Sequence, residues 1–232
     1  MLGWWHHPRG TTREEQRQMR LSELSERSGV SLATIKYYLR EGLLPPGRRI
    51  TATQAEYDES HLRRLRLVRA MIHVGRVPVA TVREVLRHVD DDSLGLTMRL
   101  GAATWALPQP PEPDADDPAV ARAREEVDRL LEELGWETAR EIGDLSPVYR
   151  SLMASLATLY RLGFSLSAAE LAPYARRMEQ LAVLDMDRLD AMGTGTEQVE
   201  AAVAAAVLYD PMLLSLRRLA QEVESARRYG IV

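Results

Sequence analysis

The chain has 232 residues, 45% of them hydrophobic, which is enough for one large domain or two modest domains with a packed core. It contains no cysteine, and this excludes disulfides, thiolate metal sites and cysteine nucleophiles. It has no apolar run of about 18 residues. Its N-terminus lacks the basic-then-apolar layout of a signal peptide. We therefore expect a cytoplasmic protein with no membrane partner.

Charge is distributed unevenly along the chain. Residues 19–90 contain 13 basic and 8 acidic side chains, a net charge of +5, whereas residues 91–232 contain 14 and 24, a net charge of −10. A basic part joined to an acidic part is typical of a nucleic-acid-binding head on a body that nucleic acid repels.

Residues 1–18 hold two tryptophans and the pair His6 and His7, followed by mostly polar residues. We expect a disordered extension here. The histidine pair has no partners at ligand spacing, so the sequence predicts no metal site and no cofactor.

A helix-turn-helix pattern begins at residue 19. Gly29 ends a first short helix, Ser31 is a suitable N-cap for a second, and Gly42 ends that helix before two prolines. A short extended hairpin or wing is expected over residues 47–57. Further helices are expected over residues 58–74 and from residue 78 to about 89.

The second helix carries a cationic face. At 100° per residue, Leu32 and Leu39 share the inward side with Ile35, and Tyr38 lies at its edge. An outward side with cations and a phenol fits the major groove of DNA, although a solvated face with the tyrosines packed inside is an alternative. The predicted DNA-binding residues are Ser31, Ala33, Thr34, Lys36, Tyr37, Tyr38 and Arg40, then Arg48 and Arg49 beyond the prolines, and Arg63 and Arg64 in the next helix.

The stretch MRLSELSERSGVSLATIKYYLREGLLPPGRR, followed by YDESHLRRLRLVRAMIHVG, resembles the MerR family of transcription regulators. The pattern includes the turn at Gly29, residues 34–38, residues 42–44 and the pair Arg48 and Arg49. This resemblance covers residues 19–89. It implies a winged helix-turn-helix, a dimer on a pseudo-palindromic operator, and promoter control with RNA polymerase as a partner.

Two departures from the family pattern limit what the resemblance implies. Lys36 stands where the family usually has arginine, so the charge is kept and the bidentate fork is lost. The segment ITATQAEY replaces the family's Gly-Tyr-Arg-x-Tyr wing. Neither the wing contacts nor the DNA distortion of the family is therefore carried over.

The sequence after residue 90 predicts mainly helices. Residues 91–118 are predicted to be a connector and proline-rich linker, and residues 119–232 a helical domain for dimerisation and effector binding. Within it, Asp210 and Pro211 are expected to open a last helix. The predicted fold is mainly all-α: an N-terminal winged helix-turn-helix with a small β wing, a linker and a C-terminal helical bundle.

The end of the chain is similar to the last helix of TetR-family ligand-binding domains, in which the last two helices form the dimer interface. This likeness implies dimer contacts by Val199, Val203, Val207, Leu213, Leu216 and Leu219, with a place in the domain's own core as the alternative. A pocket for a small effector is predicted among aromatic and methionine side chains, which are also ordinary core residues. These are Trp136, Tyr149, Met153, Tyr160, Met178 and Met186.

The sequence thus favours a dimeric, DNA-binding transcription regulator controlled by a small apolar ligand. An architectural or excisionase-like recombination-directionality protein is the alternative, but such proteins are short and lack a large acidic body. No Ser-His-Asp arrangement, phosphate loop or metal cluster indicates an enzyme.

Overall fold

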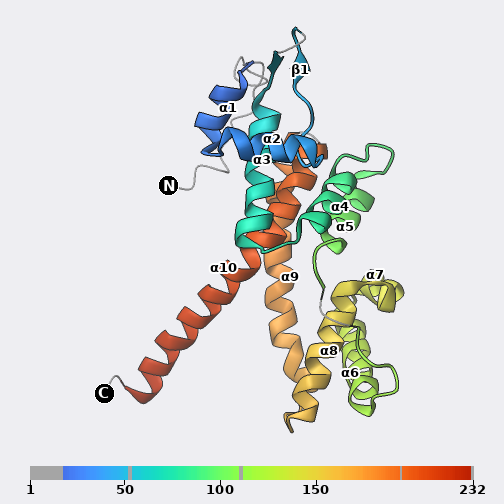
Figure 1. Cartoon of the computed structure of the whole chain (residues 1–232). Coiled ribbons are helices and arrows are strands. Elements are labelled where there is room, and N and C mark those ends of the chain that lie inside the picture. Colours follow the sequence, from blue (N-terminus) through green and yellow to red (C-terminus); the bar gives the residue numbers. More distant parts are fainter. Residues whose placement is uncertain (1–17, 52–53, 110–111, 194, 231–232) are drawn as a thin grey trace. The chain divides into compact units, whose positions relative to one another are not determined.

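The computed structural model of the whole chain describes residues 18–51, 54–109, 112–193 and 195–230 (Figure 1). Two compact units are present: unit 1 comprises residues 1–106 and 193–232, and unit 2 comprises residues 107–192. The fold is mainly helical with one small sheet, as predicted. The disorder predicted for residues 1–18 concerns a segment that lies, except for Gln18, outside the described residues.

The head of unit 1 begins with a helix-turn-helix, formed by α1 (Leu21–Ser28) and α2 (Leu32–Arg40). Gly29 adopts φ 65°, the left-handed conformation that ends α1. The Ser25 hydroxyl donates to the carbonyl of Val30 at 2.6 Å and so fixes the turn. Ser31 caps α2 by accepting from the backbone N–H of Thr34 at 3.1 Å, as the sequence predicts.

The wing is a minimal antiparallel hairpin. Strands β1 (Arg48–Arg49) and β2 (Ala55–Glu56) pair with Arg48 opposite Glu56. Two backbone hydrogen bonds join Met19 and Tyr57, at 2.7 and 2.8 Å, and anchor the wing to the start of the fold. Both side chains are buried, so the wing grows out of the core of the head.

Three helical segments continue the head. Helix α3 (Glu59–Arg69) begins at the Asp58 cap and closes with a π-helical turn, η1 (Ala70–Val74). Helices α4 (Val79–Val89) and α5 (Leu96–Trp105) follow and pack on each other. The predicted connector at residues 91–118 therefore includes a helix of 10 residues, α5.

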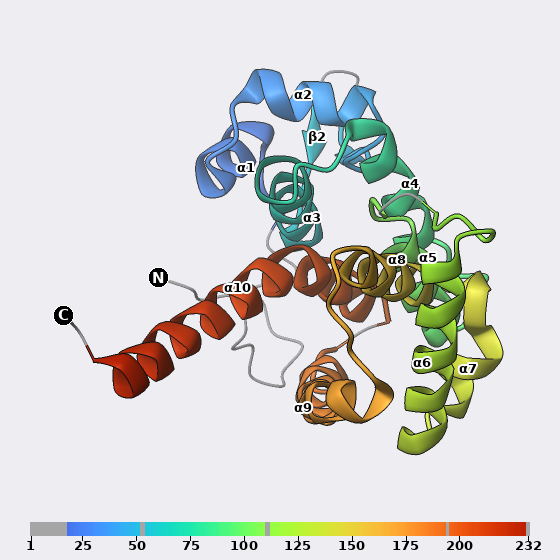
Figure 2. The same ribbon diagram turned by 90° about the horizontal axis from the view of Figure 1, so that it is seen from below.

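The last helix, α10 (Gly195–Tyr229), returns to the head (Figure 2). It packs on α5, η1 and α3, and Val199, Val203 and Val207 along it are buried. The prediction of one helical domain over residues 119–232 is therefore wrong, because α10 belongs to unit 1. The helix start predicted at Asp210 is also wrong, because α10 continues through Pro211.

By length and composition alone, α10 could cross a membrane, with a mean hydropathy of 1.6 over an 18-residue window. This is weak evidence, because core helices have the same composition. Contact of its N-terminal half with the head accounts for the apolar residues there.

Unit 2 is a small helical bundle. It contains α6 (Pro118–Leu134), α7 (Glu137–Ile142), the 3₁₀ turn η2 (Gly143–Leu145), α8 (Pro147–Arg161) and α9 (Ala168–Asp190). Helix α6 packs on both α8 and α9. Ser146 and Ser167 cap the N-termini of α8 and α9, and α9 continues through Pro173.

Candidate nucleic-acid interface

The outward face of α2 combines cations and a phenol. Lys36 and Arg40 are exposed, and Tyr37 is half-buried beside them. The guanidinium carbon of Arg40 lies 5.5 Å from the centre of the Tyr37 ring, which orients the ring by a cation–π contact. Lys36 forms no ion pair with any residue that the structure describes, so its ammonium group is available to an anion.

The first turn of α2 adds polar and apolar groups. The hydroxyls of Ser31 and Thr34 lie 2.8 Å apart and share the cap. Ala33 is exposed, as expected for a residue that lets a helix approach a groove closely. Leu32 was predicted to point inward, but it is 44% exposed, because the N-terminal turn projects beyond the core of the head. Sequence periodicity alone missed this apolar group on the outward surface.

Tyr38 is a core residue, which corrects its assignment to the DNA-binding surface. Its side chain is 3% exposed, and its ring centre lies 5.8 Å from that of Tyr37. Burial raises the pKa of the Tyr38 phenol, and the nearby charge of Arg69 only partly offsets this. The two adjacent tyrosines therefore have different roles, one on the surface and one inside.

Arg48 and Arg49 lie on the first strand of the wing, and both are exposed. The Arg48 guanidinium pairs with the Glu56 carboxylate across the hairpin at 2.6 Å. Nε of Arg49 donates to the carbonyl of Thr51 at 3.3 Å. The wing thus presents two guanidinium groups on a paired backbone.

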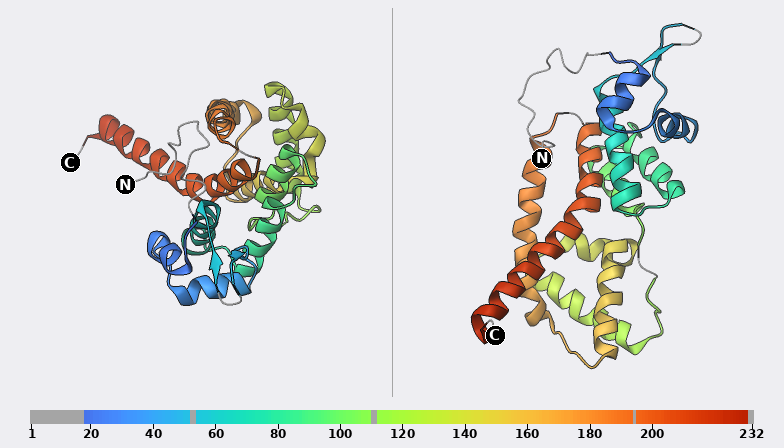
Figure 3. Two further views of the ribbon diagram at one scale, coloured as in Figure 1. Left: turned by 90° about the horizontal axis from the view of Figure 1, so that it is seen from above. Right: turned by 60° about the vertical axis from the view of Figure 1, so that its left-hand side comes forward.

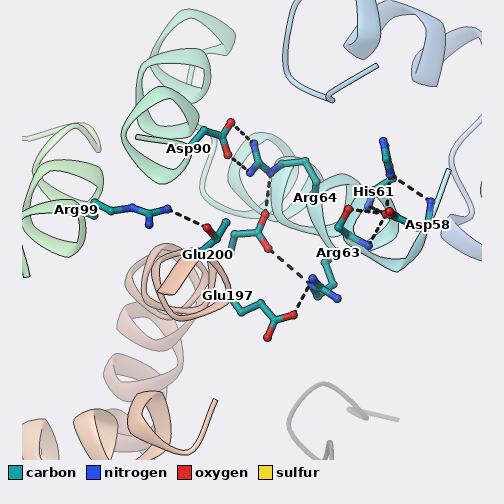
Figure 4. Close-up of polar contacts among 10 residues, drawn as sticks. Asp58, His61, Arg63, Arg64, Asp90, Arg99, Glu197 and Glu200 are labelled. Atoms are coloured by element: carbon teal, nitrogen blue, oxygen red, sulfur yellow. Dashed lines mark hydrogen bonds and ion pairs between the residues drawn. The ribbon is translucent and has the colours of Figure 1, made fainter. Parts of the chain in front are cut away.

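Arg63 and Arg64 both pair with carboxylates of α10 (Figure 4). The burial of Arg64 corrects its assignment to the DNA-binding surface. Arg64 is 5% exposed and binds Asp90 and Glu200, and Arg63 pairs with Glu197 at 2.7 Å. Burial acts to lower the pKa of Arg64, but the hydrogen bonds and charges of Asp90 and Glu200 outweigh it and raise that pKa. Arg64 is a structural cation.

The predicted dimer residues divide into two groups along α10. Val199, Val203 and Val207 are buried within unit 1. They are core residues, the alternative that the sequence left open, and the prediction that they form a dimer interface is wrong. Leu213 is half-buried. Leu216 and Leu219 are 53% and 55% exposed, in the part of α10 that runs away from the head (Figure 3).

The predicted effector residues lie in unit 2. Tyr149 and Met153 are buried in one apolar cluster, and Trp136 and Tyr160 pack against it. The polar groups of the three aromatic residues have protein partners: Asp128, Glu179 and the carbonyl of Leu166. Met178 and Met186 are exposed on α9 and do not join the cluster.

Comparison with known proteins identifies the head. Residues 19–89 match the family described as MerR HTH family regulatory protein. The HTH-type transcriptional regulator ZntR homolog of Haemophilus influenzae is 36% identical over 50 residues, covering 22% of this chain and 37% of that protein. The HTH-type transcriptional regulator AdhR of Bacillus subtilis is 30% identical over 57 residues, 25% of this chain and 41% of that protein. The chain thus spans about two fifths of the length of these curated relatives.

A solved structure extends the comparison beyond the head. The crystal structure of SCO5550 from Streptomyces coelicolor A3(2), described as a transcriptional regulator, has 64% sequence identity and a TM-score of 0.81. The match covers 92% of this chain and 99% of that one. The head matches the family model, and nearly the whole chain is similar to a transcriptional regulator. This protein therefore belongs to the MerR family of helix-turn-helix transcriptional regulators.

Proposed function

We propose that the protein is a dimeric regulator that binds a pseudo-palindromic DNA operator and acts on RNA polymerase at a promoter. The observation that carries this proposal is the outward face of α2, where Lys36 and Arg40 flank Tyr37. A helix of this width enters the major groove, and the exposed arginines of the wing are suited to the flanking phosphates. The net charge of +5 over residues 19–90 favours binding to a polyanion.

Substitution of Lys36 and Tyr37 tests this surface. We expect Lys36→Ala and Tyr37→Ala each to cost about 1–3 kcal/mol of binding free energy on a duplex selected from a randomised pool. Loss of one phosphate contact at Lys36 would also reduce the slope of log K against log salt by about one. Gel-shift titrations at several salt concentrations measure both quantities.

Arg129→Ala is the matched control for Lys36→Ala. Arg129 is exposed on α6 in unit 2, and its loss removes one positive charge from the chain without touching the head. The DNA affinity of Arg129→Ala, and its slope of log K against log salt, should equal those of the wild type. Full affinity and full sequence discrimination in both α2 variants would reject α2 as the recognition helix.

The dimer part of the proposal rests on the C-terminal half of α10. Met212, Leu216, Leu219 and Val223 are spaced by four, three and four residues and are 44–71% exposed. We call these four residues the α10 seam. Their spacing is that of a coiled-coil seam, and they lie on the side of the helix opposite Val203, which faces the head. A second copy of α10 is the partner that this repeat fits.

Glutamate substitutions on opposite sides of the helix test the seam. Leu216→Glu would place a carboxylate in the seam, and because burying an unpaired charge costs several kcal/mol, the dimer should dissociate at working concentrations. Leu214→Glu is the control, because Leu214 is 43% exposed but lies on the other side of α10. Light scattering should show a monomer for the first variant and a dimer for the second. The same mass for both variants would reject the seam.

Control by a small apolar effector is the remaining part of the proposal. Four of the six candidate side chains meet in the apolar cluster of unit 2, which supports a site there. Since the Tyr149 hydroxyl is already bonded to Asp128 at 2.7 Å, a ligand is expected to use apolar contacts around Met153 instead. A panel of apolar compounds, scored by melting temperature and by DNA affinity, tests this. Compounds that change neither quantity argue for a regulator without a ligand.

A further inference from the structure

A cluster of ion pairs around the buried guanidinium of Arg64 joins α10 to the head (Figure 4). Arg64 contributes every nitrogen of its guanidinium: Nη1 and Nη2 donate to the two carboxylate oxygens of Asp90, and Nε donates to Glu200 at 2.8 Å. The guanidinium fork is rigid and planar, so these bonds are made together in only one arrangement of the three residues. One side chain on α3 therefore fixes both the end of α4 and the start of α10.

A second buried arginine repeats this arrangement from α5. Arg99 is 6% exposed, and its Nη2 donates to the carbonyl of Val89 and, at 3.0 Å, to the hydroxyl of Thr196. Val89 is the last residue of α4, and Thr196 lies in the first turn of α10. The same two helix ends are thus held from two sides. We call Arg64, Asp90, Arg99, Thr196 and Glu200 the α10 clamp.

A third contact, farther along α10, fixes its direction. A Cβ atom at Gly75 would lie 2.7 Å from Val207, so the turn after η1 packs closely on α10. Val207 is seven residues beyond Glu200, a distance of about 10 Å along the helix. Two separated points of contact determine the axis of a helix, whereas one would let it pivot.

Stability alone is a poor reason for such a cluster. Removing charges from water costs about as much as their attraction returns, and apolar residues of similar size would often serve as well. The best-attested use of buried polar groups is to select one packing geometry among several. In unit 1, the geometry under selection is the direction of α10 relative to the recognition helix α2.

We propose that the α10 clamp is a specificity device: by fixing α10 on the head, it sets the half-site spacing that the dimer accepts. This rests on the proposed function, since the seam at the far end of α10 must pair two copies. A change in the angle of α10 is transmitted through the seam to both recognition helices. Arg64 and Glu200 are then positioning residues, which act on DNA only through α10.

Duplexes of altered spacing test this proposal. The probe is a two-half-site duplex selected from a randomised pool by the wild-type chain, with derivatives whose central spacer is one or two base pairs longer or shorter, and a duplex with one half-site. The spacing ratio is the affinity for the selected duplex divided by that for the derivatives. For Glu200→Gln and Thr196→Ala we expect this ratio to fall by roughly 2- to 30-fold. Affinity for the single half-site should stay at the wild-type value.

Two further variants separate positioning from stability. Val82→Ala opens a cavity in α4 at a residue that is 0% exposed, so it destabilises the head without touching the clamp, and its spacing ratio should be that of the wild type. Arg64→Lys keeps the charge and loses the fork, so its ratio should fall with that of Glu200→Gln. If Glu200→Gln does not fold by circular dichroism, Thr196→Ala decides, because it removes one hydroxyl from a half-buried position.

Unchanged spacing ratios in folded, dimeric clamp variants would overturn the proposal while leaving the proposed function intact. A lower ratio in Val82→Ala of the same size would also overturn it, because loss of stability would then be the cause. If the wild-type chain prefers no duplex, or is a monomer by light scattering, the proposed function itself fails, and this is seen before any variant is made.

Discussion

Lys36 is the only lysine of the chain, and it occupies the outward face of α2 together with Arg40. An ammonium group is a compact, strongly hydrated charge on a flexible stem, whereas a guanidinium group is a planar fork that matches two acceptors. Lys36 is therefore suited to one phosphate or one base acceptor, and Arg40 to a bidentate contact. Base discrimination by α2 should depend on its other side chains more than on Lys36.

Asp58 shows how one side chain joins the wing to α3. It follows the buried Tyr57, and its Oδ1 accepts from the backbone N–H of Ser60 at 3.0 Å and contacts Nδ1 of His61 at 2.8 Å. Burial acts to raise the pKa of this carboxyl, but the hydrogen bonds from Ser60 and His61 together outweigh it and lower that pKa. A lowered pKa means that the charged form is bound more favourably in the folded state than in the unfolded chain.

The sign of the pH dependence follows from this shift. The stabilisation by the charge is fully present above the unfolded pKa of about 3.9 and is lost as pH falls through the lower, folded pKa. We expect Asp58→Ala to cost about 1 kcal/mol at pH 7, the usual cost of losing a cap. Asp58→Asn keeps an acceptor and should cost less, and its difference from the wild type should shrink below about pH 4. Urea unfolding at pH 7, 5 and 3 measures these differences, and a difference that does not change with pH would contradict the role of the charge.

At the scale of elements, local signals predict where most helices begin and end. The caps at Ser31, Asp58, Ser146 and Ser167 are all present, because a side chain and a backbone N–H two or three residues away need only local geometry to meet. The wing could be placed from sequence for the same reason. Its small size and its pairing with Met19 could not, since that bridge spans distant residues.

Pro211 shows where a local signal is misleading. Asp followed by Pro is typical of a helix start, yet α10 runs through both residues. Proline removes the hydrogen bond to the carbonyl four residues earlier, which here belongs to Val207. Among the described residues, Val207 is the last buried position of α10. The signal thus marks the point where the helix leaves the head, not a point where it begins.

Gly47 offers a test of the wing as an element. A Cβ atom at this position would lie 2.7 Å from the carbonyl oxygen of Glu56 and 2.8 Å from the ring of Tyr57, so β1 and β2 must separate to admit it. We expect Gly47→Ala to destabilise the head by about 1–3 kcal/mol, as overpacking does, and to weaken DNA binding by displacing Arg48 and Arg49. Thermal unfolding and gel-shift titration measure the two effects.

Gly101→Ala is the control for this substitution. Gly101 lies within α5, and a Cβ atom there would meet nothing within 4 Å. This variant should gain up to about 1 kcal/mol in stability, because alanine favours a helix, and should leave DNA binding unchanged. A Gly47→Ala variant with wild-type stability and DNA affinity would show that β1 and β2 can separate without loss of stability, and would contradict this prediction.

At the scale of the whole molecule, the sequence misleads about which parts belong together. The acidic second part of the chain was predicted to be a single helical domain, but α10 completes the core of the basic head. The contact between Arg64 and Glu200 joins residues 136 positions apart. Neither periodicity nor a cap can reveal such a pair. This is also why Arg63 and Arg64 were predicted to face DNA: on their own helix they are an arginine pair, and their carboxylate partners lie far along the chain.

The division of α10 leads to a prediction about truncated chains. A chain that ends at residue 210 keeps Val199, Val203 and Val207 on the head and loses the part of α10 that carries the seam. It should fold as the full chain does but remain a monomer in light scattering. A chain that ends at residue 118 loses the whole of α10, which uncovers buried surface and leaves Arg64 without Glu200. Breaking a buried ion pair by removing one partner costs about 3–5 kcal/mol, so this second chain should unfold at a clearly lower temperature.

The two truncated chains together distinguish the roles of the two halves of α10. If the seam alone mattered, both would be equally stable monomers, and the first half of α10 would be no part of the head. If the first half alone mattered, the chain ending at residue 210 would still be a dimer, and the partner surface would lie elsewhere. A stable monomer from the first truncation and a destabilised head from the second are expected together, because burial of α10 ends at Val207 and its exposed repeat begins at Met212. Thermal unfolding, followed by circular dichroism, and light scattering on the same samples provide both measurements.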